Sequence, residues 1–66
     1  MRSLVSFTPF DVVTLKVDVP EENLYRGMQG VVIDIYEKPE KAYEVEFCDS
    51  EGRTISQIAL LPDQIA

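Results

Sequence analysis

Hydrophobic and polar residues alternate along most of this chain with a period of two, the spacing that places neighbouring side chains on opposite faces of a β-strand. The segment 11–17, DVVTLKV, is rich in β-branched residues and predicts a first strand with Val13, Leu15 and Val17 on one face. A period of two does not fit the apolar stripe of a helix. The pattern therefore indicates an all-β protein.

A second strand is predicted over residues 30–37, GVVIDIYE, directly after a long loop. An antiparallel strand with one face on a core alternates between inward apolar and outward polar residues. The alternation here predicts Val31, Ile33 and Ile35 on the inner face. The residues expected on the outer face are Val32, Asp34 and Tyr36.

The third predicted strand covers residues 42–49, AYEVEFCD, and has the most regular alternation in the chain. Pro39 separates it from the second strand, because proline has no backbone N–H to donate to a sheet. The residues expected inward are Tyr43, Val45 and Phe47, and those expected outward are Glu44 and Glu46.

Residues 54–61, TISQIALL, predict a fourth strand whose alternation slips once, as at a β-bulge. Pro62 and Asp63 then predict one helical or 3-10 turn, after which Ile65 returns to the sheet as a very short last strand. The apolar residues of the fourth strand are Ile55, Ile58 and Leu60.

The connections carry turn-forming residues. The loop of residues 18–30 contains Leu24, which we expect to be buried, because so long a loop stays ordered only when part of it is anchored. Gly27 and Gly30 stand where this loop enters the second strand, so we expect a positive φ or a close approach to another strand there. Gly52 suits a positive φ in a hairpin between the third and fourth strands.

These elements predict a small SH3-like barrel of four to five antiparallel strands, with one short 3-10 or helical turn near the C-terminus. An OB-like barrel is the alternative, but it needs longer strands and an intervening helix. We assign residues 10–66 to the barrel, with Phe10 expected to cap one end. Residues 1–9 form an N-terminal arm, for which a disordered start, an added edge strand and a docking arm remain open.

Composition limits the classes of partner and of metal site that this chain could have. Six basic and twelve acidic residues give a net charge of −6, which disfavours nucleic acids and anionic membranes and permits a basic protein partner. The single cysteine, Cys48, cannot form a disulfide within the chain, and the chain has no histidine, so the usual zinc ligand sets are missing. Neither a signal-peptide core nor an apolar span of membrane length is present, so we expect a cytoplasmic protein.

Two blocks of sequence carry a family resemblance. The stretches VTLKVDVPEENLYRGMQGVVIDIY and AYEVEFCDSEGRT resemble a family of small bacterial proteins catalogued as domain of unknown function 4926. Members of that family share the pattern G-x-x-G-x-V followed by Y-x-V-E-F-x-D-x-x-G-x-T, and the resemblance covers about Phe10 to Ile65. It implies a small SH3-like barrel with no established activity and assigns no site residues.

The element G-x-x-G-x-V also resembles, more weakly, the KOW motif of SH3-like ribosomal and transcription-factor domains. KOW domains that bind RNA carry basic residues around the glycine loop, whereas this loop has only Arg26. The acidic residues expected around it are Asp18, Glu21, Glu22 and Asp34.

The chain offers little catalytic chemistry. Catalysis requires a nucleophile, a base or a metal held in a pocket, and the carboxylates here are scattered at strand spacing. Glu44, Glu46 and Asp34 could bind a cation weakly or act as an acid and base pair, but a solvated strand face is the simpler interpretation. We expect Cys48 to be a half-buried apolar residue. We predict no enzyme activity, no cofactor and no metal.

Aromatic side chains on loops and outer strand faces are the groups with which SH3-like barrels bind peptides. The sequence therefore favours a non-enzymatic module that docks on a basic protein partner, with an antitoxin-like or immunity-like role as one version. The alternatives are a KOW-like nucleic-acid or ribosome-associated module and a structural subunit of a larger complex, and the oligomeric state is left open. The candidate partner-binding residues are Tyr25, Met28, Asp34, Tyr36, Glu44 and Glu46.

Overall fold

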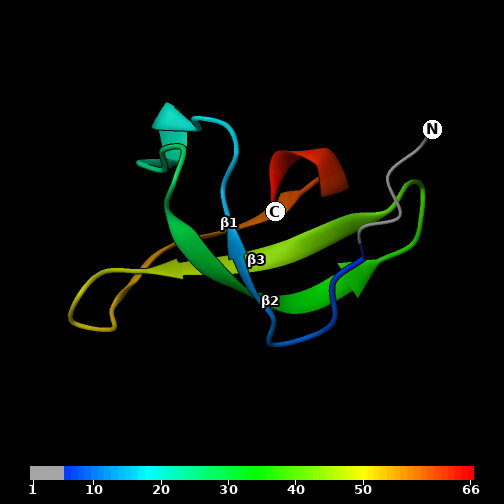
Figure 1. The fold of residues 1–66 in the computed structure, drawn as a ribbon, viewed down its shortest axis with the longest axis horizontal. Coiled ribbons are helices and arrows are strands. Elements are labelled where there is room, and N and C mark those ends of the chain that lie inside the picture. Colours follow the sequence, from blue (N-terminus) through cyan, green and yellow to red (C-terminus); the bar gives the residue numbers. More distant parts are fainter. Residues whose placement is uncertain (1–5) are drawn as a thin grey trace.

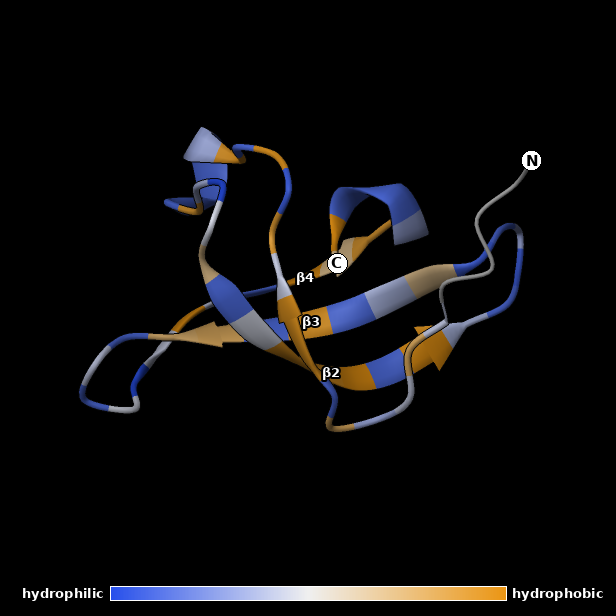
Figure 2. Cartoon of the chain, in the orientation of Figure 1, coloured by the Kyte–Doolittle hydropathy of each residue, from blue (hydrophilic) through white to orange (hydrophobic). Residues whose placement is uncertain are grey.

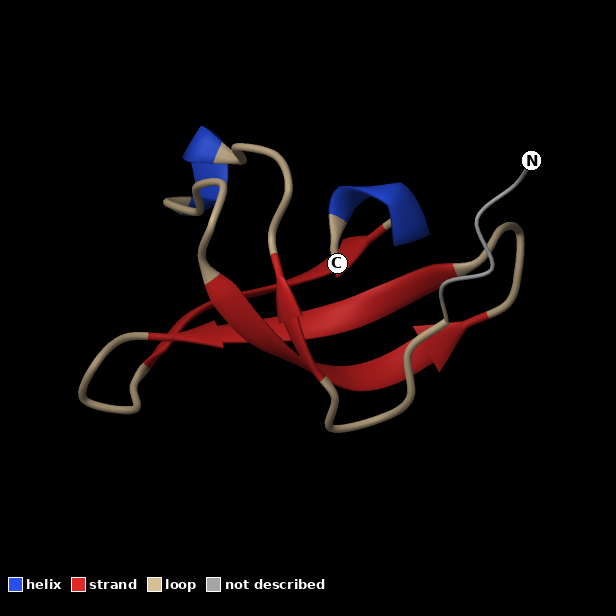
Figure 3. Cartoon of the chain, in the orientation of Figure 1, coloured by secondary structure: helices blue, strands red, loops and turns tan. Residues whose placement is uncertain are grey.

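The computed structural model describes residues 6–66 and contains one antiparallel sheet of four strands in the order β1-β2-β3-β4 (Figure 1). Figure 3 shows the twisted sheet together with two single turns of 3-10 helix, η1 and η2. The all-β prediction is confirmed, including the turn near the C-terminus. The elements are β1 (Val12–Thr14), η1 (Pro20–Glu22), β2 (Gln29–Tyr36), β3 (Ala42–Cys48), β4 (Thr54–Leu60) and η2 (Pro62–Gln64).

The C-terminal residues close the sheet against β1. Ile65 forms an isolated bridge with Leu15, and Thr14 and Ala66 exchange two backbone hydrogen bonds of 2.8 and 2.9 Å. Lys16 N–H donates to the Gln64 carbonyl at 2.8 Å. The predicted return of Ile65 to the sheet is therefore confirmed.

The core lies on the inner face of the sheet. Figure 2 shows hydrophobic and hydrophilic residues in alternating bands along β3, and the predicted inward residues of this strand are buried. Burying aliphatic and aromatic side chains is the main stabilising contribution available to so small a domain. The buried residues are Val13, Leu15, Leu24, Val32, Tyr43, Val45, Phe47, Leu60 and Ile65, and Val17, Val19, Ile35 and Ile58 pack against them.

The prediction for the first half of β2 was wrong. Val32 is fully buried and pairs with Val45, whereas Val31 and Ile33 are only partly buried. The register shifts between Val32 and Asp34, so Ile33 is an extra residue in the strand. Because a bulge inserts one residue, it reverses the faces beyond it, and Ile35 reaches the core as predicted.

A second bulge lies in β4. Phe47 pairs with Ser56 and Cys48 pairs with Thr54, which leaves Ile55 unpaired and 38% exposed. This confirms the predicted slip and locates it at Ile55. Beyond it, Leu60 is buried and completes the core.

Gly27 before β2 and Gly30 within it fulfil the two expected roles. Gly27 has a φ of +96°, which disfavours residues with a side chain. Gly30 lies within β2, where a methyl group would meet the Val45 Cγ1 atom at 2.6 Å and the Glu46 carbonyl oxygen at 2.9 Å. β2 can therefore approach β3 this closely only with glycine at position 30. Gly52 has the positive φ predicted for the hairpin.

The long loop is anchored as predicted, because Leu24 is fully buried and forms a bridge with Val19. Glu22 of η1 accepts a hydrogen bond from the Ser56 hydroxyl, which holds the loop to β4.

At the N-terminal side, Phe10 does not cap the barrel. It has a φ of +73° and is 78% exposed. Phe7 instead packs edge-on against Tyr43, with ring centroids 5.3 Å apart. Leu4 and Val5 of the predicted arm lie outside the described residues.

Candidate functional site

The outer face of the sheet is the surface opposite the core, and strand pairing determines which side chains share it. Val12 pairs with Val31, Val31 with Glu46, and Glu46 with Gln57, so one row crosses all four strands. A second row runs from Asp34 through Glu44 to Ala59. We use the name outer face for the following residues: Val12, Thr14, Gln29, Val31, Asp34, Tyr36, Ala42, Glu44, Glu46, Cys48, Thr54, Gln57 and Ala59.

Asp34, Tyr36 and Glu44 come together at one end of this face. Asp34 and Glu44 are directly opposite each other in the ladder, and the Tyr36 hydroxyl donates to Glu44 Oε1 at 3.3 Å. Desolvation of the phenol raises the pKa of Tyr36, and the negative charge of Glu44, its hydrogen bond and the charge of Asp34 raise it further. Tyr36 therefore stays protonated and able to donate over the physiological range.

Neutral groups satisfy the two glutamates of β3. Gln57 Nε2 donates to Glu44 Oε2 at 3.2 Å, and Thr54 Oγ1 donates to Glu46 Oε2 at 2.7 Å. The ion pairs found within residues 6–66 lie elsewhere, in the two hairpin loops: Lys41 pairs with Glu37, and Arg53 pairs with Asp49 and Glu51. Across this part of the chain, the negative charge of the outer face is therefore oriented by hydrogen bonds and not compensated by a cation.

Tyr25 and Met28 lie away from this acidic end. They precede β2, whereas Tyr36 is its last residue, and seven residue steps of an extended strand span roughly 23 Å. Tyr25 is 47% exposed and its N–H donates to the Met28 sulfur at 3.3 Å, while Met28 packs against the core. The six predicted residues thus fall into an acidic group on the sheet and a separate loop pair.

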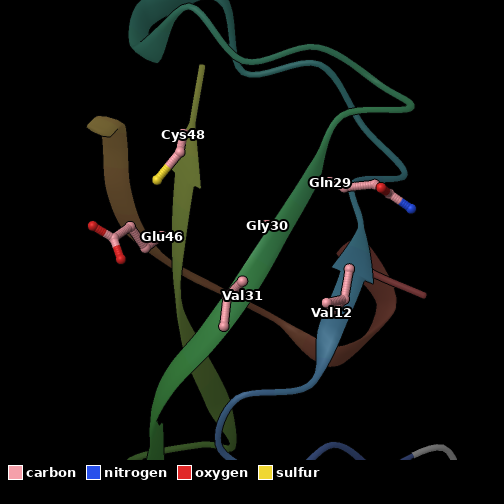
Figure 4. Close-up of a pocket in the computed structure, with 6 residues that line it drawn as sticks. All are labelled: Val12, Gln29, Gly30, Val31, Glu46 and Cys48. Atoms are coloured by element: carbon pink, nitrogen blue, oxygen red, sulfur yellow. The ribbon is translucent and has the colours of Figure 1, made fainter. Parts of the chain in front are cut away.

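An open pocket of about 120 Å³ crosses the other end of the outer face (Figure 4). Val12 is 63% exposed beside Val31, and Gly30 lines the pocket with its backbone, because a side chain at this position would point into the core. Cys48 is exposed here, so its predicted half-burial was wrong. The lining residues are Val12, Gln29, Gly30, Val31, Glu46 and Cys48.

Sequence reasoning missed this pocket, because Val12 belongs to the predicted outer side of the first strand and carries no chemical signal. Only the register that pairs Val12 with Val31 and Val31 with Glu46 brings the lining together.

The described residues contain no cluster of three or more cysteine and carboxylate groups that could hold a metal ion. Within residues 6–66, no helix has both the length and the apolar character needed to cross a membrane.

The fold and its outer face define a small all-β domain with an acidic, hydrogen-bonded sheet surface and a shallow apolar hollow beside it. A family model described as Domain of unknown function (DUF4926) matches residues 10–66, and the chain belongs to this family. No curated protein and no solved structure matches the chain. The resemblance found in the two sequence blocks is thus confirmed.

Proposed function

We propose that this domain is a non-enzymatic protein-interaction module whose outer face binds a basic surface of a protein partner. The observation that carries the proposal is the group of Asp34, Glu44 and Glu46, whose carboxylates share one sheet face with neutral hydrogen-bond donors as their partners. A lysine or arginine of a partner would supply the cation that these carboxylates lack within residues 6–66.

Tyr36 adds a contact of a different kind. Tyr36 is 39% exposed and its hydroxyl donates to Glu44, so the side chain presents an apolar surface in a set orientation. Tyrosine contributes much contact area at low cost in conformational entropy, which is why it is enriched at interfaces. The proposed contact residues are therefore Asp34, Tyr36, Glu44 and Glu46. Tyr25 and Met28 would take part only in a partner large enough to reach the loop.

Charge complementarity of this kind increases the association rate and sets orientation more than it increases affinity. Binding should weaken as salt rises, because the Debye length falls to about 10 Å at 0.1 M ionic strength. The small size, the acidity and the scarcity of catalytic groups support an antitoxin-like or immunity-like role toward a basic protein. A basic protein encoded beside this chain would be the first partner to test.

The test is affinity purification of the tagged chain from a lysate of its own host, at low and at physiological salt, with mass spectrometry of the bound proteins. A matched pair of variants gives the test its specificity. Glu44→Gln/Glu46→Gln removes two charges from the outer face, and Glu21→Gln/Asp63→Asn removes two exposed charges from the 3-10 turns.

We expect a basic protein that is retained at low salt, is released at higher salt and is lost from the outer-face variant but not from the control variant. If both variants lost the bound protein equally, the interaction would depend only on net charge, and this result would contradict binding through the outer face. Recovery of RNA and ribosomal proteins would replace the proposal with the KOW-like nucleic-acid function.

A further inference from the structure

One edge of the sheet is covered by the C-terminal residues, and the other edge is not. Residues 64–66 cover β1 with three backbone hydrogen bonds: Thr14 N–H to Ala66, Ala66 N–H to Thr14, and Lys16 N–H to Gln64. The last two form the bridge between Leu15 and Ile65. β4 stands at the opposite edge and pairs only with β3 (Figures 1 and 3). Within residues 6–66, no backbone group of residues 54–60 forms a hydrogen bond outside the β3 ladder.

Natural edge strands are blunted by lysine, by inward-pointing charges, by proline, by β-bulges or by a covering loop. β4 has two such features near its start, the bulge at Ile55 and the hydrogen bond from Ser56 to Glu22 of the long loop, and the rest of the strand has none of them. The seven residues TISQIAL include no charge and no proline, although 27% of the chain is charged. Thr54, Gln57 and Ala59 are exposed on this strand. Beyond the bulge, the outer backbone groups of residues 57–60 are therefore available to an added strand.

We propose that β4 accepts an extended basic segment of the partner as an additional antiparallel or parallel strand. This inference rests on the proposed function and specifies its binding mode: main-chain hydrogen bonds to β4 supply affinity, and alternate side chains supply specificity. On the outer face, a residue of the added strand would lie beside Gln57 or Ala59, whose partners on β3 are Glu46 and Glu44. That strand would be about 10 Å from β3, a distance that a lysine or arginine and a glutamate side chain can bridge together.

Charge decides between a basic segment and a second copy of this chain. Pairing β4 with β4 of another copy would bring two molecules of net charge −6 together along their uncovered edges. An extended basic segment would instead be attracted by the negative charge of this chain.

The probe is a nine-residue peptide of alternating lysine and threonine with acetylated and amidated ends, titrated into the full chain. Two further peptides carry the same charge with backbone N-methyl groups on all lysines or on all threonines. In an added strand, the N–H groups of one alternate set face β4 and those of the other set face solvent. We expect one methylated peptide to bind about tenfold or more weakly than the parent and the other to bind like the parent.

Amide hydrogen exchange of the protein gives the second measurement. Alternate amides of residues 54–60 should exchange quickly in the free chain and become protected when the parent peptide binds, whereas β2 amides should not change. Equal binding of all three peptides with no new protection in β4 would overturn strand addition and leave charge-driven docking intact. If none of the three basic peptides binds at low salt, both this inference and the proposed function fail. A dimer in sedimentation with β4 protected in the absence of peptide would show that a second copy occupies the edge.

Discussion

Replacing Gly30 by alanine places a methyl group in the contact between β2 and β3. The added carbon would lie 2.6 Å from Val45 Cγ1, 2.9 Å from the Glu46 carbonyl oxygen and 2.9 Å from Phe47 Cδ1. The Val45 and Phe47 side chains are fully buried, and the third atom belongs to the backbone, so none of them can move without disturbing the core. The strands must separate locally to admit the methyl group.

Forcing an extra methyl group into a packed core costs about 1–3 kcal/mol. At about 2 kcal/mol, Tm would fall by roughly 8–16 °C, since a domain of this size loses 4–8 °C for each kcal/mol. The measurement is thermal and urea unfolding of Gly30→Ala followed by circular dichroism. Tyrosine fluorescence can follow the same transition, because the chain has no tryptophan.

Gly27→Ala is the matched control, because no atom lies within 4 Å of its added methyl group. It should destabilise through its φ of +96° alone, by about 1–2 kcal/mol. In a Val45→Ala background, Gly30→Ala should cost measurably less than in the wild type, whereas Gly27→Ala should cost the same. A Gly30→Ala variant that unfolds within about 0.5 kcal/mol of the wild type would refute the close approach.

Three further predictions follow from other parts of the molecule. A backbone hydrogen bond from Arg53 is the largest cause that lowers the pKa of Asp49, so Asp49 stabilises the fold above its unfolded pKa. That stabilisation is lost as the pH falls through the lower folded pKa, and urea unfolding of Asp49→Asn between pH 7 and 2 should show a weaker pH dependence than the wild type. In Glu44→Gln, NMR titration should give a lower pKa for Tyr36 than in the wild type, still above the ordinary value because desolvation remains, and an unchanged pKa would contradict the contact. Leu24→Ala should cost about 2–5 kcal/mol in urea unfolding, because Leu24 is fully buried, and a cost below 1 kcal/mol would mean that the long loop is not anchored there.

The strands differ in how far their sequences predicted them. In β3, charged residues alternate with apolar ones, so only one set can face the core, and the predicted faces are correct. In β2, Val31, Val32 and Ile33 are equally apolar, so the pattern could not choose which residue the bulge would place in the core. The fourth strand contained a visible break in its alternation, which suggested a bulge but left the register open, and the structure places the bulge at Ile55.

The candidate site shows the same division. Glu44 and Glu46 face outward because charged and apolar residues alternate along β3. The β2–β3 register then places Asp34 and Tyr36 on the same face. Tyr25 and Met28 were grouped with them because the sequence does not show which end of β2 each residue occupies in space. The structure separates them by the length of that strand.

The sequence alone determined the strand content, the acidic outer side of β3 and the positions where only glycine is suited, because these depend on alternation, charge and local backbone preferences. Tertiary structure decided which β2 residue fills the core, that Val12 and Cys48 line one pocket, and which sheet edge the C-terminus covers. These features depend on hydrogen-bonded pairing between segments far apart in the chain, and a shift of one residue in that pairing turns a strand's side chains to its other face.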